Sequence, residues 1–205
     1  SIYDMPYKDK NKQKEAQHNH YLKNKSKYFD SRVKNRDKRS IWFDDIKSKL
    51  FCGKCGFSDK RSLDFHHRNE IDKSFGISDA VKSAFSQERI LEEISKCDVL
   101  CANCHVLHHF SNKEIYCKKA ITNNCSWYRD YKSKLSCVDC KISNPIVLSF
   151  HHVKSKTDGV SSMLFQGCSI AKLIEEIEKC EVLCFNCHRI RHEGNVWKEA
   201  SKLNY

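Results

Sequence analysis

Four Cys-x-x-Cys pairs constrain this chain more than any other feature of its sequence. They form two sets of two, and matching pairs in the two sets lie 83 to 85 residues apart. Thiolates two residues apart are typical of zinc knuckles, and a structural zinc takes four ligands. We therefore predict one structural Zn²⁺ per set, the first held by Cys52, Cys55, Cys101 and Cys104 and the second by Cys137, Cys140, Cys184 and Cys187. Free or redox-active thiols are the alternative.

The cysteine pairs belong to a tandem repeat. Residues 90–105 (ILEEISKCDVLCANCH) match residues 173–188 (LIEEIEKCEVLCFNCH) at 11 of 16 positions, KSKLFCGKC matches KSKLSCVDC, and LDFHH matches LSFHH. Such a long period indicates one supersecondary unit used twice. Units this small have small hydrophobic cores and need additional stabilisation, such as a bound metal. We expect repeat 1 at 40–110, a linker at 111–124, repeat 2 at 125–195 and a C-terminal tail at 196–205.

The charge of the chain favours a polyanionic partner. Lys and Arg number 37 against 26 Asp and Glu, and residues 1–39 alone hold 12 against 5. We expect these residues to form a basic N-terminal arm, helical from about residue 9, that lies along phosphates; a solvated, partly disordered tail is the alternative. The candidate DNA-binding residues are Arg32, Lys34, Arg36, Lys38 and Arg39 in the arm, with Arg189 and Arg191 in repeat 2.

Composition also bears on the compartment. No run approaches 18 apolar residues, so we expect no transmembrane helix. The first residues lack an apolar stretch, so we expect no secretory signal peptide. The cysteine count of 13 is odd, which argues against a disulfide framework and for a reducing, intracellular compartment.

The local patterns predict an α+β fold in each repeat. We expect a helix before the first knuckle, a strand ending at paired histidines, a helix capped by Ser86 or Ser169, a short strand, and a last helix starting near Asn103 or Asn186. In the middle helices, the side chains expected to face the core are Ile90, Leu91, Ile94, Leu173, Ile174 and Ile177. Cys97 and Cys180 are predicted to be buried thiols rather than ligands; Cys117, Cys125 and Cys168 have no predicted role.

The histidines are concentrated in the same segments. Nine of the 11 lie either at the ends of the predicted strands or in the last helices, where His105 and His109, like His188 and His192, are four residues apart. Residues at i and i+4 share one helix face, so two imidazoles can converge on one metal or phosphate. Four cysteines already fill a zinc sphere. The histidines therefore indicate a second centre, suited to metal-assisted phosphodiester hydrolysis.

In these motifs the sequence resembles the HNH, or ββα-metal, nuclease family, in the form that carries a structural zinc. The resemblance is carried by CGKC…LDFHH…LCANCHVLHH and CVDC…LSFHH…LCFNCHRIRH, and the lysine-rich leader with WF and KSKL looks like the front of small phage-encoded HNH proteins. It implies two tandem ββα-metal units with general bases His67 and His152. It also implies catalytic-metal ligands His66, His105, His151 and His188, with His109 and His192 as a third ligand or a phosphate contact. Mg²⁺ or Mn²⁺ is expected, and Zn²⁺ or Ni²⁺ would also suit.

The resemblance implies a DNA endonuclease with two active sites in one chain. It would act on double-stranded DNA as a monomeric pseudo-dimer and cut both strands, in the cytoplasm of a bacterial or phage-infected cell, as a homing or DNA-processing enzyme. The family's asparagine before the second knuckle is missing, and Asp64 and Arg68 of repeat 1 become Ser149 and Val153 in repeat 2. The alternatives are a zinc-dependent DNA-binding module without catalysis, a restriction or defence nuclease, and an RNA-directed nuclease.

Overall fold

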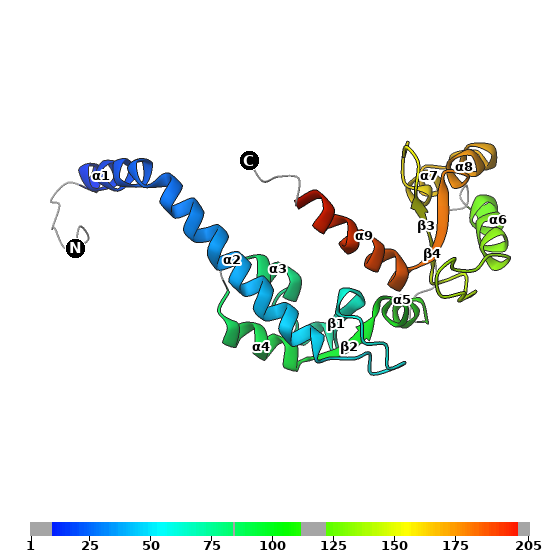
Figure 1. Ribbon diagram of the computed structural model, residues 1–205, viewed down its shortest axis with the longest axis horizontal. Coiled ribbons are helices and arrows are strands. Elements are labelled where there is room, and N and C mark those ends of the chain that lie inside the picture. Colours follow the sequence, from blue (N-terminus) through cyan, green and yellow to red (C-terminus); the bar gives the residue numbers. More distant parts are fainter. Residues whose placement is uncertain (1–9, 84, 112–121, 201–205) are drawn as a thin grey trace. The chain divides into compact units, whose positions relative to one another are not determined.

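The computed structural model describes residues 10–83, 85–111 and 122–200 of the chain (Figure 1). The chain divides into two compact units, an arm unit and a double-knuckle unit. The arm unit comprises Ser1–Asp45 and Ser74–Glu93, and the double-knuckle unit comprises Ile46–Lys73 and Ile94–Tyr205. Cys117 and most of the expected linker lie outside the described residues.

The arm unit is built from helices. Helix α1 spans Lys10–Lys23 and α2 spans Lys25–Ser48, and neither has a buried residue. The run of residues without Gly or Pro is therefore helical, as predicted, and Asn24 at the junction donates from Nδ2 to the His20 carbonyl (2.9 Å). Helix α2 runs through the expected arm boundary at residue 39, so the helix predicted before the first knuckle is the end of α2. Helices α3 (Ile77–Lys82) and α4 (Gln87–Ser95) complete this unit.

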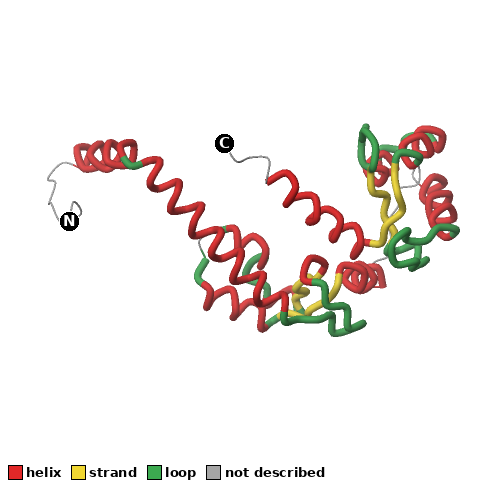
Figure 2. Tube along the Cα trace, in the orientation of Figure 1, coloured by secondary structure: helices red, strands yellow, loops and turns green. Residues whose placement is uncertain are grey.

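Two small antiparallel sheets organise the double-knuckle unit, as Figure 2 shows in yellow. Strand β1 (Leu63–His67) pairs with β2 (Cys97–Cys101), and β3 (Leu148–His152) pairs with β4 (Cys180–Cys184). The register is the same in both sheets. The first residue of β1 and of β3 lies opposite the cysteine that ends the partner strand. The second histidine of β1 and of β3 lies opposite the cysteine that begins the partner strand. The strands predicted to end at paired histidines are confirmed.

A helix follows each sheet directly. Helix α5 spans Ala102–Ser111 and α9 spans Phe185–Ala200, so both start where the sequence predicted. Short 3-10 turns at Lys60–Ser62 (η2) and Glu70–Asp72 (η3) flank β1. The described residues therefore have a mixed α+β architecture.

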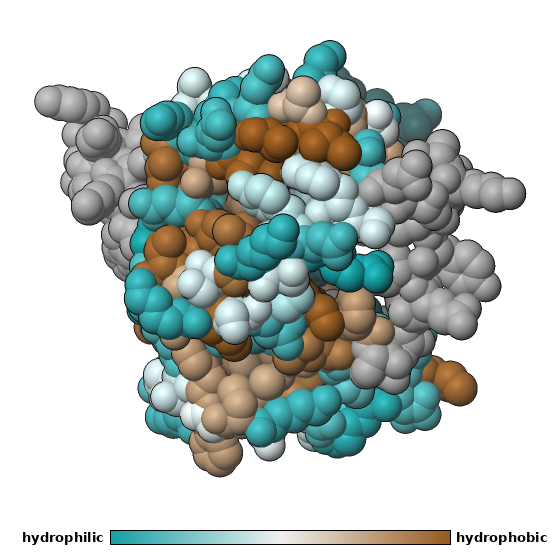
Figure 3. Space-filling model, turned by 90° about the vertical axis from the view of Figure 1, so that its right-hand side faces the viewer, coloured by the Kyte–Doolittle hydropathy of each residue, from teal (hydrophilic) through white to brown (hydrophobic). Residues whose placement is uncertain are grey.

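Repeat 2 adds a helical layer to its sheet. Helices α6 (Thr122–Ser133), α7 (Val160–Phe165) and α8 (Ile170–Ile177) enclose a core of five buried residues, Val160, Met163, Leu164, Leu173 and Ile177. Trp127, Tyr131 and Phe150 pack against that core. Some apolar side chains stay at the surface, and on the face drawn in Figure 3 apolar patches alternate with polar groups.

The prediction for the middle helices is partly wrong. Leu91 and Ile174 are exposed (46% and 36%), whereas Glu93 and Glu176 are buried (1% and 2%). The buried carboxylates accept backbone N–H groups: Ser74 donates to Glu93 Oε1 (2.7 Å) and Thr157 donates to Glu176 Oε1 (2.9 Å). A buried acid with such partners can replace an apolar side chain, and apolar periodicity alone does not reveal it.

The two repeats meet at the N-termini of α5 and α9. The Asn103 backbone N–H donates to Asn186 Oδ1 (3.1 Å), and the Asn186 N–H donates to Asn103 Oδ1 (3.2 Å). Ser62 adds a hydrogen bond from Oγ to the Asn186 carbonyl (2.8 Å), and Leu107 of α5 packs against the core of repeat 2. Each asparagine therefore caps the helix of the other repeat, a role that the sequence left open.

Candidate metal centres

Both predicted sets of four cysteines come together. In each set the four sulfur atoms lie within 4.8 Å of one another, with Cys55 Sγ 3.7 Å from Cys101 Sγ and Cys140 Sγ 3.6 Å from Cys184 Sγ. Two sulfurs bound to one tetrahedral zinc at about 2.3 Å would be about 3.8 Å apart. Both sets are therefore compatible with structural zinc.

The chemistry of these thiols also fits a cation. Although burial alone would raise them, backbone N–H groups lower the pKa values of Cys52 and Cys137 to about 7. Burial and the neighbouring sulfurs raise the pKa values of Cys104 and Cys187. A divalent cation would stabilise all four thiolates together, which is how structural zinc couples to folding.

The other cysteines stand apart from these sets. Cys97 is buried, as predicted, and Cys180 is partly buried with its Sγ 3.3 Å from the Glu176 carbonyl, to which it donates. Burial raises the pKa of Cys180 to about 11, so it stays a thiol at neutral pH. Cys125 and Cys168 pack around the core of α7 and α8.

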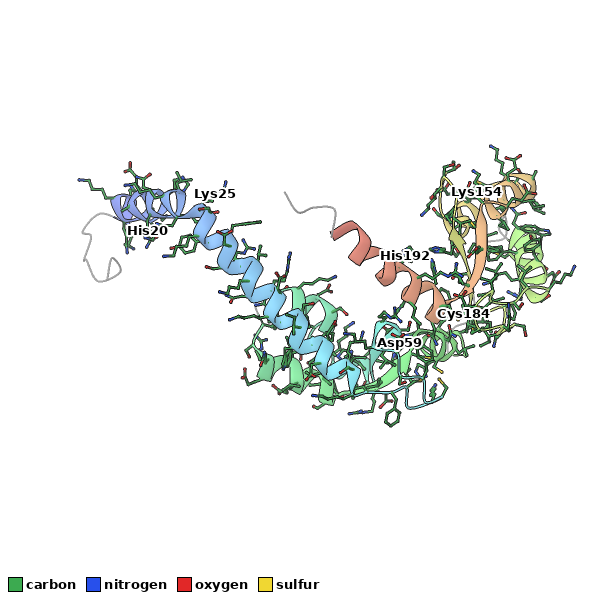
Figure 4. The ribbon with its side chains drawn as sticks, viewed as in Figure 1. His20, Lys25, Asp59, Lys154, Cys184 and His192 are labelled. Carbon is green, nitrogen blue, oxygen red and sulfur yellow. The ribbon has the colours of Figure 1, made fainter. Side chains whose placement is uncertain are left out.

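The histidines form a second pair of clusters. His66, His105 and His109 in repeat 1, and His151, His188 and His192 in repeat 2, each bring three ring nitrogens within 4.8 Å of one another. Figure 4 labels Cys184 at the end of β4 and His192 on α9, and α9 carries members of both clusters of repeat 2. The six residues that the resemblance implied as catalytic-metal ligands are therefore gathered into two triads.

The spacing of the ring nitrogens suits one shared metal. His105 Nε2 lies 3.2 Å from His66 Nδ1 and 3.1 Å from His109 Nε2, and His188 Nε2 lies 3.0 Å from His192 Nε2. Two nitrogens bound at about 2.0–2.1 Å to one metal would be about 2.9–3.4 Å apart. The strand end supplies one imidazole, and one helical turn supplies the other two.

Burial favours the neutral imidazole at His66, His151 and His188. Burial, followed by the nearby His192 and His151, lowers the pKa of His188 to about 4. Burial also lowers the pKa values of His66 and His151, again with help from neighbouring histidines. A metal binds the neutral ring, so these environments prepare the side chains as ligands at neutral pH.

The two proposed metal ligands that follow the zinc cysteines each make a hydrogen bond from the ring nitrogen away from the triad. His105 Nδ1 lies 2.9 Å from Asp64 Oδ2, and His188 Nδ1 lies 3.1 Å from Ser149 Oγ. Such a bond fixes the tautomer and leaves Nε2 for a metal. Hydrogen bonds from His105 and Arg189 outweigh the effect of burial and lower the pKa of Asp64 to about 2, so it is ionised.

His152 is held by a buried carboxylate that sequence reasoning missed. Its Nε2 lies 2.8 Å from Glu176 Oε1, and Lys179 Nζ lies 2.7 Å from Glu176 Oε2. The Lys179 hydrogen bond is the main cause that lowers the pKa of Glu176 to about 2. An ionised carboxylate only accepts hydrogen bonds, so His152 Nε2 carries a proton, and in the neutral ring Nδ1 is then the acceptor. The Glu-Glu pairs at matching positions of ILEEI and LIEEI were the sequence signal that could have pointed to this carboxylate.

A cavity adjoins these groups in repeat 2. Its volume is about 360 Å³, within the usual range of ligand sites. Its lining includes the general-base candidate His152, all three triad histidines, a cation, a hydroxyl and an aromatic ring: His151, His188, His192, Lys156, Ser161 and Phe185. The cavity is therefore open to an anionic group beside the triad.

The predicted DNA-binding residues differ in their surroundings. Arg32, Lys34 and Lys38 are exposed on α2, Arg36 pairs with Asp37 (3.3 Å), and Arg39 Nε donates to the Val81 carbonyl (3.2 Å). In repeat 2 both candidates pair with carboxylates: Arg189 with Asp64 (2.6 Å), and Arg191 with Asp139 (3.1 Å) and Glu181. Phosphate binding by the latter two would have to compete with these ion pairs.

Among the residues that the structure describes, no helix is long and apolar enough to span a membrane. Comparisons with known protein families, with curated proteins and with solved structures find no match. The function therefore has to be argued from the geometry and chemistry of the site.

Proposed function

We propose that this chain is a divalent-metal-dependent endonuclease of the HNH type that hydrolyses phosphodiester bonds in double-stranded DNA. The observation that carries the proposal is the site of repeat 2. There, three imidazoles with the spacing of one metal share a cavity with His152, whose Nε2 lies 2.8 Å from a buried carboxylate. Repeat 1 holds the matching triad and the matching His67 at the end of β1.

The donor set bears on the choice of cation. Three imidazoles and no protein oxygen suit Zn²⁺, Ni²⁺ or another transition ion better than Mg²⁺, which prefers oxygen ligands. A cation held there would neutralise charge on the scissile phosphate and on the leaving oxygen. We therefore favour a transition ion over the Mg²⁺ expected from the resemblance.

His152 is proposed as the general base. Glu176 holds the Nε2 proton, which leaves Nδ1 to take a proton from the attacking water. Because Glu176 is buried and also bound by Lys179 and Thr157, it fixes the imidazole in that orientation. Lys156 lines the same cavity and would contribute positive charge toward the phosphate.

Two such sites in one chain support cleavage of both strands. The reciprocal hydrogen bonds between Asn103 and Asn186 hold the two repeats together, so no second copy of the chain is required. The exposed cations of α2 would add phosphate contacts that position DNA without reading its sequence.

The test is cleavage of supercoiled plasmid by zinc-loaded protein with added Mn²⁺, Ni²⁺, Zn²⁺ or Mg²⁺, and with EDTA. We expect linear product from the wild type, nicked circles from His67→Ala and from His152→Ala, and intact plasmid from the double variant. A general base contributes about 10²–10⁴-fold, so each loss is readily measured. Leu91→Ala, at an exposed position on α4, is the control and should cleave like the wild type.

Other outcomes would contradict the proposal. Retained DNA binding without cleavage under any cation would favour the DNA-binding module. Cleavage of RNA but not DNA would favour the RNA-directed nuclease. Full loss of cleavage from one single variant, with no effect of the other, would show a single working site.

A further inference from the structure

The two histidine triads differ in the group that holds one of their ligands. In repeat 1, His105 Nδ1 faces the carboxylate of Asp64 (2.9 Å). In repeat 2, the same position is Ser149, whose Oγ lies 3.0 Å from the Leu183 carbonyl and 3.1 Å from His188 Nδ1. The single hydroxyl proton goes to the carbonyl, so Ser149 accepts a hydrogen bond from His188 as a neutral group. His105 is thus hydrogen-bonded to a carboxylate anion, whereas His188 is hydrogen-bonded to a neutral hydroxyl group.

Asp64 is in turn held from the other repeat. Arg189 NH1 lies 2.6 Å from Asp64 Oδ1, while Oδ2 faces His105, so each carboxylate oxygen has its own partner. The Asp64 side chain is 24% exposed. Val106 is the residue of repeat 1 that matches Arg189, and it cannot form an ion pair with Ser149. The ion pair between Arg189 and Asp64 therefore has no equivalent between Val106 and Ser149.

We infer that the two histidine sites are unequal: the site of repeat 1 binds a divalent cation more tightly than that of repeat 2, because Asp64, held by Arg189, positions His105. This rests on the proposed function, in which both triads bind a cation. A carboxylate behind a metal-bound imidazole raises its basicity and fixes its orientation, and loss of such a partner typically lowers metal affinity about 10–100-fold. Asp64 is a positioning residue, since it acts through His105.

Nickel binding to protein loaded with two zinc ions, one for each set of four cysteines, measured by titration calorimetry, tests the inference without any cleavage assay. We expect two binding events of one Ni²⁺ each, whose constants differ about 10-fold or more. His109→Ala should abolish the tighter event and His192→Ala the weaker one, which assigns each event to its repeat.

Reciprocal substitutions then test the cause. Asp64→Ser should weaken the tighter site about 10–100-fold, toward the constant of the other, and Ser149→Asp should strengthen the weaker site. Arg189→Val should weaken the tighter site several-fold and leave the weaker one unchanged, because the freed carboxylate loses its fixed orientation. Val106→Ala is the matched control and should change neither constant. Asp64→Asn keeps the side-chain shape and serves if Asp64→Ser loses zinc or folded structure.

The outcomes separate this inference from the proposed function. Two nickel events with equal constants, or an Asp64→Ser variant that weakens both sites alike, would overturn the inequality while leaving the triads as metal sites. An unchanged constant in Arg189→Val would remove Arg189 from the explanation. Protein that binds two zinc ions but no nickel would overturn the proposed metal sites themselves.

Discussion

The reciprocal asparagine contact predicts a measurable cost for each of its two hydrogen bonds. Asn103 and Asn186 are almost buried (8% and 5% exposed), and each carboxamide accepts the backbone N–H at the start of the other repeat's helix. Asn186→Ala would leave the Asn103 N–H without this acceptor, and Asn103→Ala would leave the Asn186 N–H without its acceptor. A buried donor that loses its partner costs about 1–3 kcal/mol, and loss of a helix cap about 0.5–2 kcal/mol. We expect each variant to lose about 1–3 kcal/mol of unfolding free energy.

Urea unfolding of zinc-loaded protein, followed by circular dichroism, measures this loss. Because the two variants remove different bonds, the double variant should lose about the sum, roughly 2–6 kcal/mol, with some coupling between such close sites. Asn35→Ala, at an exposed position on α2, should stay within about 0.5 kcal/mol of wild type. Single variants that are no less stable than this control would refute the reasoning, and so would a loss confined to one of the two.

Three further predictions concern other parts of the chain. Cys52→Ser should lower the bound zinc by one ion relative to the wild type, whereas Cys97→Ser should keep the wild-type content, as metal analysis would show. The folded-state pKa of Glu176 is about 2, below its ordinary 4.5, so its ionised form stabilises the fold above pH 4.5 and this contribution is lost as the pH falls towards 2. The stability difference between wild type and Glu176→Gln should therefore stay nearly constant between about pH 7 and pH 5 and shrink as the pH falls from about 4.5 towards 2. Replacing Lys34 and Lys38 by Ala should reduce the slope of log affinity for DNA against log salt by about 2, if both contact phosphates.

Local patterns were enough to predict the elements that carry the candidate sites. The Cys-x-x-Cys spacing and the paired histidines are local, so the two sheets and the starts of α5 and α9 follow from short stretches of sequence. Helices α3 and α7 were not predicted, because each has six residues and follows a glycine, Gly76 or Gly159, without a side-chain cap. So short a helix carries too little periodicity to be recognised.

Contacts between distant residues account for most of what the sequence did not reveal. The sequence showed that Asp64 is replaced by Ser149 in repeat 2, but not that Arg189, 125 residues further along, binds Asp64. Likewise, Asn103 and Asn186 were visible as a repeated pair, yet their role depends on two helix N-termini meeting. Partners of this kind follow from the packing of the two repeats, which spacing within one repeat does not specify.

The unequal sites have a consequence for the order of the proposed reaction. The asparagine contact is symmetric because each residue must supply both an N–H and an acceptor, whereas the pair of Asp64 and Arg189 has no counterpart. The two sites can therefore differ in affinity while the repeats stay joined. At limiting cation the site of repeat 1 would fill first. Nicked circles should therefore accumulate at low cation concentration, and linear product should appear as the concentration is raised. In Ser149→Asp the nicked intermediate should decline, because the two affinities converge. A plasmid assay that yields linear product without a nicked intermediate at every cation concentration would contradict this order.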